Sequence, residues 1–260
     1  MSERPRAAAA ICAAACCLAL AACAGLNAQR LQNADAHYRM ATASLQQPGG
    51  IQNEVNRRAA YPELTLAIKL DSGNAQYRQL LGALYFYGQD FSSAERETLL
   101  ALEMDPELAE AHNNLGLVYM AQGRLSEAAA QFRKALENLS YPTPEYAAFN
   151  LGNAEYRLGN FVEAVEAYKR SLAILPNNFD GQLGLGLCYT RLGLLAEAAK
   201  SYAEAVRLRP DTPRPRYELG MTLFKLGRKD EAAVQFRRVA ELEPSGELGE
   251  QSRIYLRLLK

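Results

Sequence analysis

The chain has 260 residues but no Trp, only two His and a single Cys outside its first 23 residues. One remaining thiol cannot build a disulfide framework, and two histidines without nearby cysteines do not match a zinc-ligand pattern. Lys and Arg together number 29, and so do Asp and Glu, so there is no basic excess for contacts with nucleic-acid phosphates. The composition therefore argues against a metal centre, a disulfide scaffold and a nucleic-acid partner.

Catalytic side chains in a useful arrangement are also missing. The Gly184-Leu185-Gly186 run does not follow a strand, so it does not read as a phosphate-binding loop. His112 and Cys188 both fall where small or aromatic residues pack between helices, which favours a core role for each. We predict that the chain is not an enzyme and that it takes no cofactor and no small-molecule substrate.

The N-terminus carries a targeting pattern. Arg4 and Arg6 precede an apolar run over residues 7–20, which is too short for an ordinary membrane span. The Leu20-Ala21-Ala22-Cys23 sequence that follows resembles the bacterial lipobox. The resemblance implies a signal peptide over residues 1–22 and a lipid on Cys23, in the form of a diacylglycerol and an amide-linked acyl chain such as palmitate. The alternatives are an uncleaved signal anchor and an ordinary cut after Ala22.

The lipid sets the expected location. Several buried acyl methylenes, at about 0.8 kcal/mol each, make such an anchor effectively permanent. Ala24, rather than Asp, follows the lipidated position. In Gram-negative lipoproteins this favours the outer membrane, with the chain facing the periplasm. Residues 23–34 are expected to form a short tether.

Most of the remaining chain is an internal repeat. Segments begin at Ala75, Ala109, Glu145, Phe179 and Pro213, at intervals of 34, 36, 34 and 34 residues. Each has Leu-Gly at positions 7 and 8 and Ala at position 20. Position 24 carries an aromatic residue in the last four segments and Thr98 in the first. Four segments also have Gly at position 15, where a turn between helices is expected.

This pattern resembles the tetratricopeptide repeat, in which each unit is a pair of antiparallel helices. The resemblance implies an all-α fold, a right-handed superhelix of about six tetratricopeptide repeats plus a C-terminal cap helix. A degenerate first repeat starts near Asp35, with a six-residue insertion near residues 51–56, so the repeat domain spans residues 35–260. The repeats begin near residues 35, 75, 109, 145, 179 and 213, and the cap helix covers residues 247–259.

The first helix of each repeat has a second apolar side. At about 100° per residue, positions 2, 5, 9, 12 and 13 gather opposite the packing face and are expected to line the inner groove. Its apolar members are Phe86, Tyr87, Leu117, Met120, Tyr146, Phe149, Tyr156, Leu183, Leu187, Tyr217, Met221 and Phe224.

Two interpretations of this stripe stay open. The side chains could cover one another in a tightly curled stack, or they could form a groove for an amphipathic helix or extended peptide of a protein partner. Positive charge grows toward the C-terminal half of the groove, which suggests a partner with an acidic flank. It comes from Arg157, Arg191, Arg214 and Lys225, against the single acid Asp180.

A two-residue insertion makes a narrower resemblance possible. It ends in Leu139-Ser140-Tyr141-Pro142-Thr143-Pro144 and precedes Asn150-Leu151-Gly152. With the signal, the lipobox and the repeat count, this is similar to the pilotins, the tetratricopeptide-repeat outer-membrane lipoproteins of type IV pilus biogenesis. That family implies binding of the secretin subunit and promotion of its localisation and assembly. A lipid-anchored scaffold for cell-wall enzymes and an accessory lipoprotein of another pilus or secretion system are the alternatives.

Overall fold

The computed structural model describes the backbone of residues 4–259 and the side chains of residues 24–259. The proposed signal peptide and the Cys23 side chain therefore lie outside the described side chains. The chain forms two compact units, residues 1–114 and 115–260, and each is described by itself.

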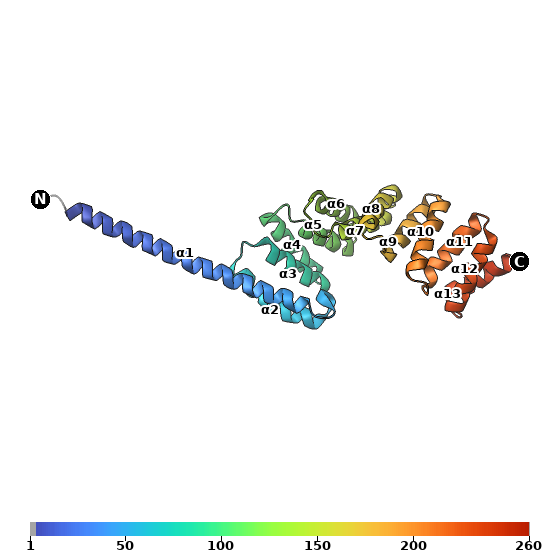
Figure 1. The fold of residues 1–260 in the computed structure, drawn as a ribbon, viewed down its shortest axis with the longest axis horizontal. Helices are drawn as coiled ribbons and strands as arrows, with labels where there is room; N and C mark the ends of the chain where they lie inside the picture. Colours follow the sequence, from blue (N-terminus) through green and yellow to red (C-terminus); the bar gives the residue numbers. More distant parts are fainter. Residues whose placement is uncertain (1–3, 260) are drawn as a thin grey trace. The chain divides into compact units, whose positions relative to one another are not determined.

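Every element is a helix within the described residues (Figure 1). The first unit contains α1 (Arg4–Leu45), the short 3₁₀ helix η1 (Gly50–Gln52), α2 (Glu54–Leu70), α3 (Ala75–Tyr87) and α4 (Phe91–Met104). Helix α5 (Ala109–Ala121) contains the boundary between the units. The second unit contains α6 (Leu125–Glu137), α7 (Pro144–Leu158), α8 (Phe161–Ile174), α9 (Phe179–Arg191), α10 (Leu195–Leu208), α11 (Pro213–Lys225), α12 (Lys229–Leu242) and α13 (Glu247–Leu258).

Consecutive helices pack as pairs: α1 with α2, α3 with α4, α7 with α8, α9 with α10, and α11 with α12. Helix α13 then packs on α12. The predicted fold class is confirmed, because the chain is an array of helix pairs that ends in one additional helix.

The helix ends follow local sequence signals. The Asn74 and Asn178 side chains accept hydrogen bonds from backbone N–H groups in the first turns of α3 and α9. Pro144 and Pro213 occupy the first position of α7 and α11, where a missing N–H has no cost. These signals start the helices at a regular spacing, so that equivalent side chains recur on equivalent faces.

One contact recurs inside the repeats. In the second unit, glycine at position 8 of the first helix lies against the aromatic ring at position 24 of the second. A Cβ placed on Gly152 would lie 2.8 Å from the Tyr168 ring, and one on Gly186 would lie 2.6 Å from the Tyr202 ring. Both tyrosines are buried. The glycine is therefore needed to let the ring fill the space between the paired helices.

The turn between paired helices requires a left-handed backbone. Gly123, Gly159, Gly193 and Gly227 take φ values of 78°, 85°, 73° and 75°. In the first unit, Gln89 takes the same conformation with φ 64°, although it has a side chain. The turn geometry is therefore kept at Gln89 at the cost of backbone strain.

We expect Gln89→Gly to stabilise the protein by about 0.5–1 kcal/mol. A non-glycine residue in the left-handed conformation costs about 1–2 kcal/mol, and part of this gain is offset because glycine loses more backbone entropy on folding. Urea unfolding followed by circular dichroism measures the change. The matched control, Gly227→Gln, places a side chain in the same conformation with no atom near its Cβ. It should lose a similar amount of stability, and equal midpoints for all three proteins would contradict the strain argument.

The first helix pair differs from its predicted form. Helix α1 begins well before Asp35, so residues 24–34, expected as a tether, are helical. No proline interrupts this segment, and its Ala, Leu, Gln and Arg residues favour helix. Ala34 is already buried and belongs to a core with Ala41, Ala60 and Leu64.

The insertion in this pair forms a compact turn. After α1, η1 leads to Asn53, whose side chain caps α2 by accepting from the Val55 N–H. The Asn56 side-chain amide donates to the carbonyls of Gln47 and Gly50 at 3.2 and 3.0 Å. The additional residues therefore bind back onto the pair instead of forming an open loop.

Candidate partner-binding groove

In the first unit, two predicted groove residues lie on the last turn of α3. The Phe86 ring is half-buried, with its centroid 5.3 Å from that of Tyr87 and 5.8 Å from that of Phe91. Tyr87 is 36% exposed. The two residues form a small aromatic surface at the C-terminal end of α3.

In the second unit, the predicted residues lie on α5, α7, α9 and α11, and none of them is fully buried. Tyr146 is 53% exposed. The half-buried members are Leu117, Met120, Phe149, Tyr156, Leu183, Leu187, Tyr217, Met221 and Phe224. Arg157 and Arg191 are exposed. Each side chain of the stripe is thus partly packed against neighbouring residues and partly open to solvent.

Part of the stripe surrounds a hollow of about 420 Å³ between α7 and α9. Four predicted residues line it, namely Phe149, Tyr156, Leu183 and Leu187. Its other lining residues are Asn153, Tyr168, Asp180 and Gly184. Sequence reasoning did not select these four as site residues, although Asn153 and Asp180 occupy positions 9 and 2, which belong to the predicted inner side.

Gly184 and Tyr168 shape the floor of the hollow. A Cβ on Gly184 would lie 2.6 Å from the Tyr168 ring, so only glycine lets the ring reach this place. The Tyr168 hydroxyl donates to Asn153 Oδ1 at 2.7 Å. Burial raises the pKa of Tyr168, which keeps the phenol neutral. The hollow is therefore apolar, with one amide on its wall and one acid, Asp180, at its edge.

Nearby Cys188 has no reactive role here. The thiol is buried in the same core as Tyr168. Burial raises its pKa to about 12. The sulfur stays protonated and packs as a small apolar group, which agrees with the role predicted for it.

Toward the C-terminus, α13 partly covers the stripe. The Tyr255 ring of α13 lies 6.5 Å from the Tyr217 ring and 5.6 Å from the Phe224 ring, measured between centroids. It also stacks on Phe236 at 5.0 Å. The cap helix α13 thus covers this end of the stripe, whereas the hollow between α7 and α9 is open.

A half-buried acid lies beside the covered end. Glu218 on α11 is 4.0 Å from Arg214, between the Oε1 and Nε atoms. Burial raises the pKa of Glu218, although Arg214, Lys225 and Arg191 oppose the rise. The folded chain therefore holds this carboxylate in an environment that disfavours its charge.

We expect Glu218→Gln to be more stable than the native chain at neutral pH. When the pKa of a carboxyl is higher in the folded chain than its ordinary value of 4.5, the group favours folding at pH values below 4.5. This contribution is lost as the pH rises through the pKa of the folded chain, where the buried group must ionise. The stability difference should vanish near pH 4 and grow as pH rises, as measured by thermal unfolding across pH 4–8. Glu197→Gln controls for the loss of one exposed acid. A native chain that is the more stable at pH 7 would contradict this assignment.

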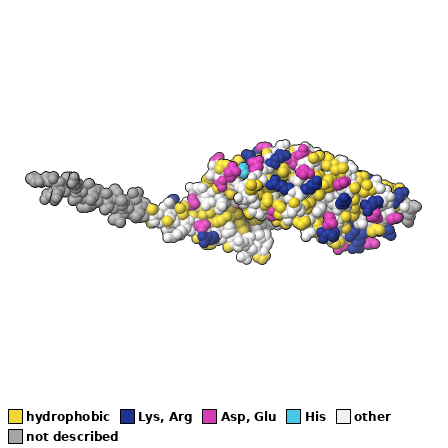
Figure 2. Space-filling view, turned by 45° about the horizontal axis from the view of Figure 1, so that its top comes forward, with side chains coloured by type: hydrophobic (Ala, Val, Ile, Leu, Met, Phe, Trp, Pro, Cys, Tyr) yellow, Lys and Arg dark blue, Asp and Glu magenta, His cyan; other side chains and the backbone are white. Residues whose placement is uncertain are grey.

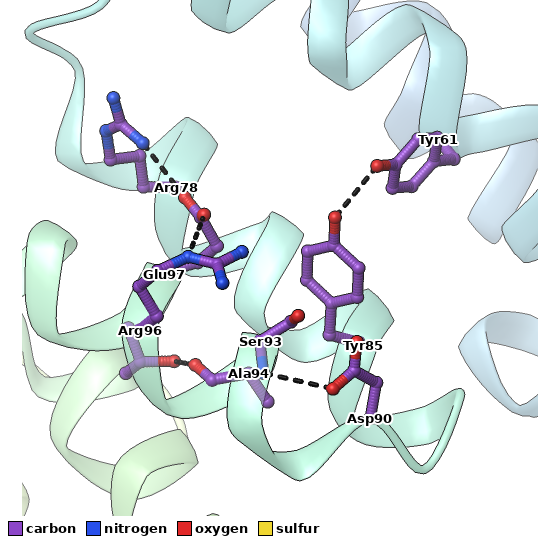
Figure 3. A network of polar contacts seen from close by, with 9 residues as sticks. Tyr61, Arg78, Tyr85, Asp90, Ser93, Ala94, Arg96 and Glu97 are labelled. Atoms are coloured by element: carbon purple, nitrogen blue, oxygen red, sulfur yellow. Dashed lines mark hydrogen bonds and ion pairs between the residues drawn. The ribbon is translucent and has the colours of Figure 1, made fainter.

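Other polar clusters serve the scaffold. In Figure 3, the buried Glu97 carboxylate of α4 accepts two hydrogen bonds. Arg78 Nη1 of α3 donates to its Oε2 at 2.9 Å, and Arg96 Nε of α4 donates to its Oε1 at 3.2 Å. In the second unit, the buried Glu155 carboxylate pairs with Arg133 and accepts from the Asn160 amide at 2.8 Å. Each buried carboxylate is satisfied by these contacts, which join neighbouring helices.

Residues 24–259 contain no cluster of three or more His, Cys, Asp or Glu that could hold a metal ion. Among the side chains that the structure describes, no helix combines the length and the apolar character needed to cross a membrane.

Comparison with known proteins identifies the repeats. Family models described as tetratricopeptide repeat match residues 107–177, 149–213 and 183–247, which together span more than half of the chain. The chain is 29% identical over 127 residues to superkiller complex protein 3 of Homo sapiens. That match covers 48% of this chain but only 8% of the human protein, so the two share repeats over a small part of the larger chain.

Solved structures with the same fold include two pilus proteins. PilF of Pseudomonas aeruginosa is 20% identical, with a TM-score of 0.73 over 87% of this chain and 99% of that one. PilW, described as a widely conserved type IV pilus biogenesis factor, is 23% identical, with a TM-score of 0.68 over 84% of this chain and 97% of that one.

These likenesses in fold agree with the family matches and with the paired helices described above. Stacked repeats of this kind present extended surfaces for binding other proteins. The chain belongs to the tetratricopeptide-repeat family.

Proposed function

We propose that this chain is a pilotin, a lipid-anchored adaptor that binds the secretin subunit of a type IV pilus and promotes its assembly in the outer membrane. The observation that carries the binding role is the open hollow between α7 and α9, lined by half-buried aromatic and aliphatic side chains. Such side chains dominate binding energy at protein interfaces. A segment of the secretin would place an apolar side chain there.

Two further observations support the link to pili. The fold is shared with PilF and PilW over nearly their whole lengths. The Leu20-Ala21-Ala22-Cys23 pattern resembles a lipobox, which would place the repeats at a membrane. Neither is specific alone, because other repeat lipoproteins share the fold and the anchor.

The N-terminal helix gives the proposed anchor a defined reach. Residues 24–33 are helical and exposed, up to the buried Ala34. At 1.5 Å per residue, a helix of this length would separate Cys23 from the first packed residue by roughly 16 Å. The anchor would act through a stiff spacer and not through a flexible tether.

The groove is best tested at Tyr146, because this residue is exposed and its replacement leaves the core intact. We expect Tyr146→Glu to abolish secretin multimers in the outer membrane while secretin monomers persist, as seen on immunoblots of membrane fractions. The reason is that a carboxylate in an apolar contact is desolvated without a partner.

The matched control is Val162→Glu on α8, which changes an equally exposed apolar residue outside the stripe (59% exposed). It should leave the multimers unchanged. Multimers that survive Tyr146→Glu and deletion of the gene would rule out the pilotin role. Co-purification of cell-wall enzymes would then favour the scaffold role.

The anchor is tested separately. Cys23→Ser should leave the helical content and the unfolding midpoint unchanged, because Cys23 precedes the first buried residue of the described side chains. It should move the protein out of the outer-membrane fraction, because the acyl chains are the proposed source of membrane affinity. Fractionation followed by immunoblotting measures this, and a variant that still sediments with the outer membrane would contradict the anchor.

A further inference from the structure

Three basic residues occupy the same repeat position in consecutive repeats of the second unit. Arg157, Arg191 and Lys225 are at position 13, at the C-terminal ends of α7, α9 and α11. Equivalent positions of stacked repeats fall along a line on one face. We call these three side chains the basic ladder.

The basic ladder adjoins the apolar stripe. Arg157 follows Tyr156 in sequence, Lys225 follows Phe224, and Arg191 lies one helical turn after Leu187. Tyr156 and Leu187 both line the hollow between α7 and α9. A segment that fills the hollow would therefore pass beside these cations.

None of the three ladder residues forms an ion pair with an acid of residues 24–259, although Arg191 and Lys225 both act electrostatically on Glu218. All three are exposed. The contact recorded for Arg157 is a 3.4 Å hydrogen bond to the Met120 carbonyl, and neither Arg191 nor Lys225 is within ion-pair distance of a described acid. By contrast, several basic residues in or just before the second helices of the repeats form ion pairs with an acid three residues away. Examples are Arg124 with Glu127, Arg207 with Glu204, and Arg228 with Glu231.

Figure 2 shows basic and acidic side chains interspersed on the face that it views. Other exposed cations, such as Lys200 and Arg237, also stand without an ion pair to a described acid. The ladder differs from them because its three cations share one repeat position beside the apolar stripe. A helix dipole accounts for a cation at the end of one helix. It does not account for an excess that follows the edge of an apolar hollow.

The charge near Glu218 shows the size of this excess. Arg191, Arg214 and Lys225 all act electrostatically on the Glu218 carboxylate, so they lie near one another around one acid. Two of these three cations are ladder residues, and Asp180 at the edge of the hollow already pairs with Arg209 at 3.9 Å. Acidic groups of a bound partner would complete the pairing and be attracted over a Debye length of about 8 Å at physiological salt.

We propose that the basic ladder binds an acidic segment of a partner protein, whose apolar side chains enter the hollow between α7 and α9. This inference rests on the proposed binding role of the groove and assigns the chemistry of its ligand. The hollow selects apolar side chains, and the ladder selects Asp or Glu beside them. Basic and neutral segments are disfavoured because they leave the cations unpaired.

The test uses the full-length protein in detergent and two fluorescein-labelled synthetic peptides of 15 residues. Both peptides carry the same Leu and Phe residues, and the intervening positions are Glu in one and Gln in the other. Fluorescence anisotropy should show the Glu peptide binding about tenfold or more tightly than the Gln peptide, the effect of about 1.4 kcal/mol. The preference should shrink as NaCl is raised from 50 to 500 mM.

Arg191→Gln with Lys225→Gln should remove the preference for the Glu peptide while the Gln peptide binds as before. The matched control, Lys200→Gln with Arg237→Gln, removes two exposed cations from α10 and α12 and should keep the preference. Glu218→Gln should tighten binding of the Glu peptide, because it removes the carboxylate on which Arg191 and Lys225 act.

Equal binding of the two peptides, or a preference that survives the Arg191→Gln and Lys225→Gln double variant, overturns the proposal. A preference lost equally in the control variant also overturns it, because charge anywhere on the chain would then suffice. None of these results touches the proposed secretin-binding role of the apolar stripe, which is judged by secretin multimers in Tyr146→Glu. Failure of that assay with a retained Glu preference would reject the pilotin role and keep the acidic ligand.

Discussion

The contact between a glycine in the first helix of a repeat and an aromatic ring in the second is the constraint on which the second unit depends. Gly152 against Tyr168 and Gly186 against Tyr202 leave no room for a Cβ. The ring fixes the distance between paired helices and is itself buried, so each pair has one close-packed arrangement. The inner faces of α7, α9 and α11 are held in place by these contacts, and their exposed side chains are free for binding.

The apolar and basic character of the groove arises because many acids of the second unit are paired with cations elsewhere in the repeats. Buried acids such as Glu155 receive a cation and an amide from neighbouring helices, and the second helices carry acid–base pairs of their own. The inner side instead keeps an open apolar hollow and a basic ladder that forms no ion pair with the acids of the described residues. This side therefore offers apolar surface together with cations that form no ion pair, which suits an adaptor that holds one segment of a partner.

Sequence reasoning worked best where a residue type has a single physical reason for its place. The left-handed turn glycines were found because only glycine adopts that backbone without strain, and Gln89 marks the turn where the pattern departs. It failed where a helix continues without a signal to begin it. Residues 24–34 have a composition that favours helix, but they lie outside the repeat pattern, so they were predicted as a tether although α1 passes through them. Likewise, no periodicity showed that Tyr255 would cover Tyr217 and Phe224, because α13 lies outside the repeat.

The sequence by itself determined the class of fold and the pairing of helices, because a 34-residue period repeats the same local rules of helix length, turn and close contact. It also determined that Arg157, Arg191 and Lys225 share one position. Only the tertiary structure decided which part of the apolar stripe is open. The hollow exists because Gly184 admits the Tyr168 ring from another helix, and burial beside neighbouring cations is a property of Glu218 in the folded chain alone. Such contacts join residues that are distant in sequence, and their geometry depends on the packing of several helices at once.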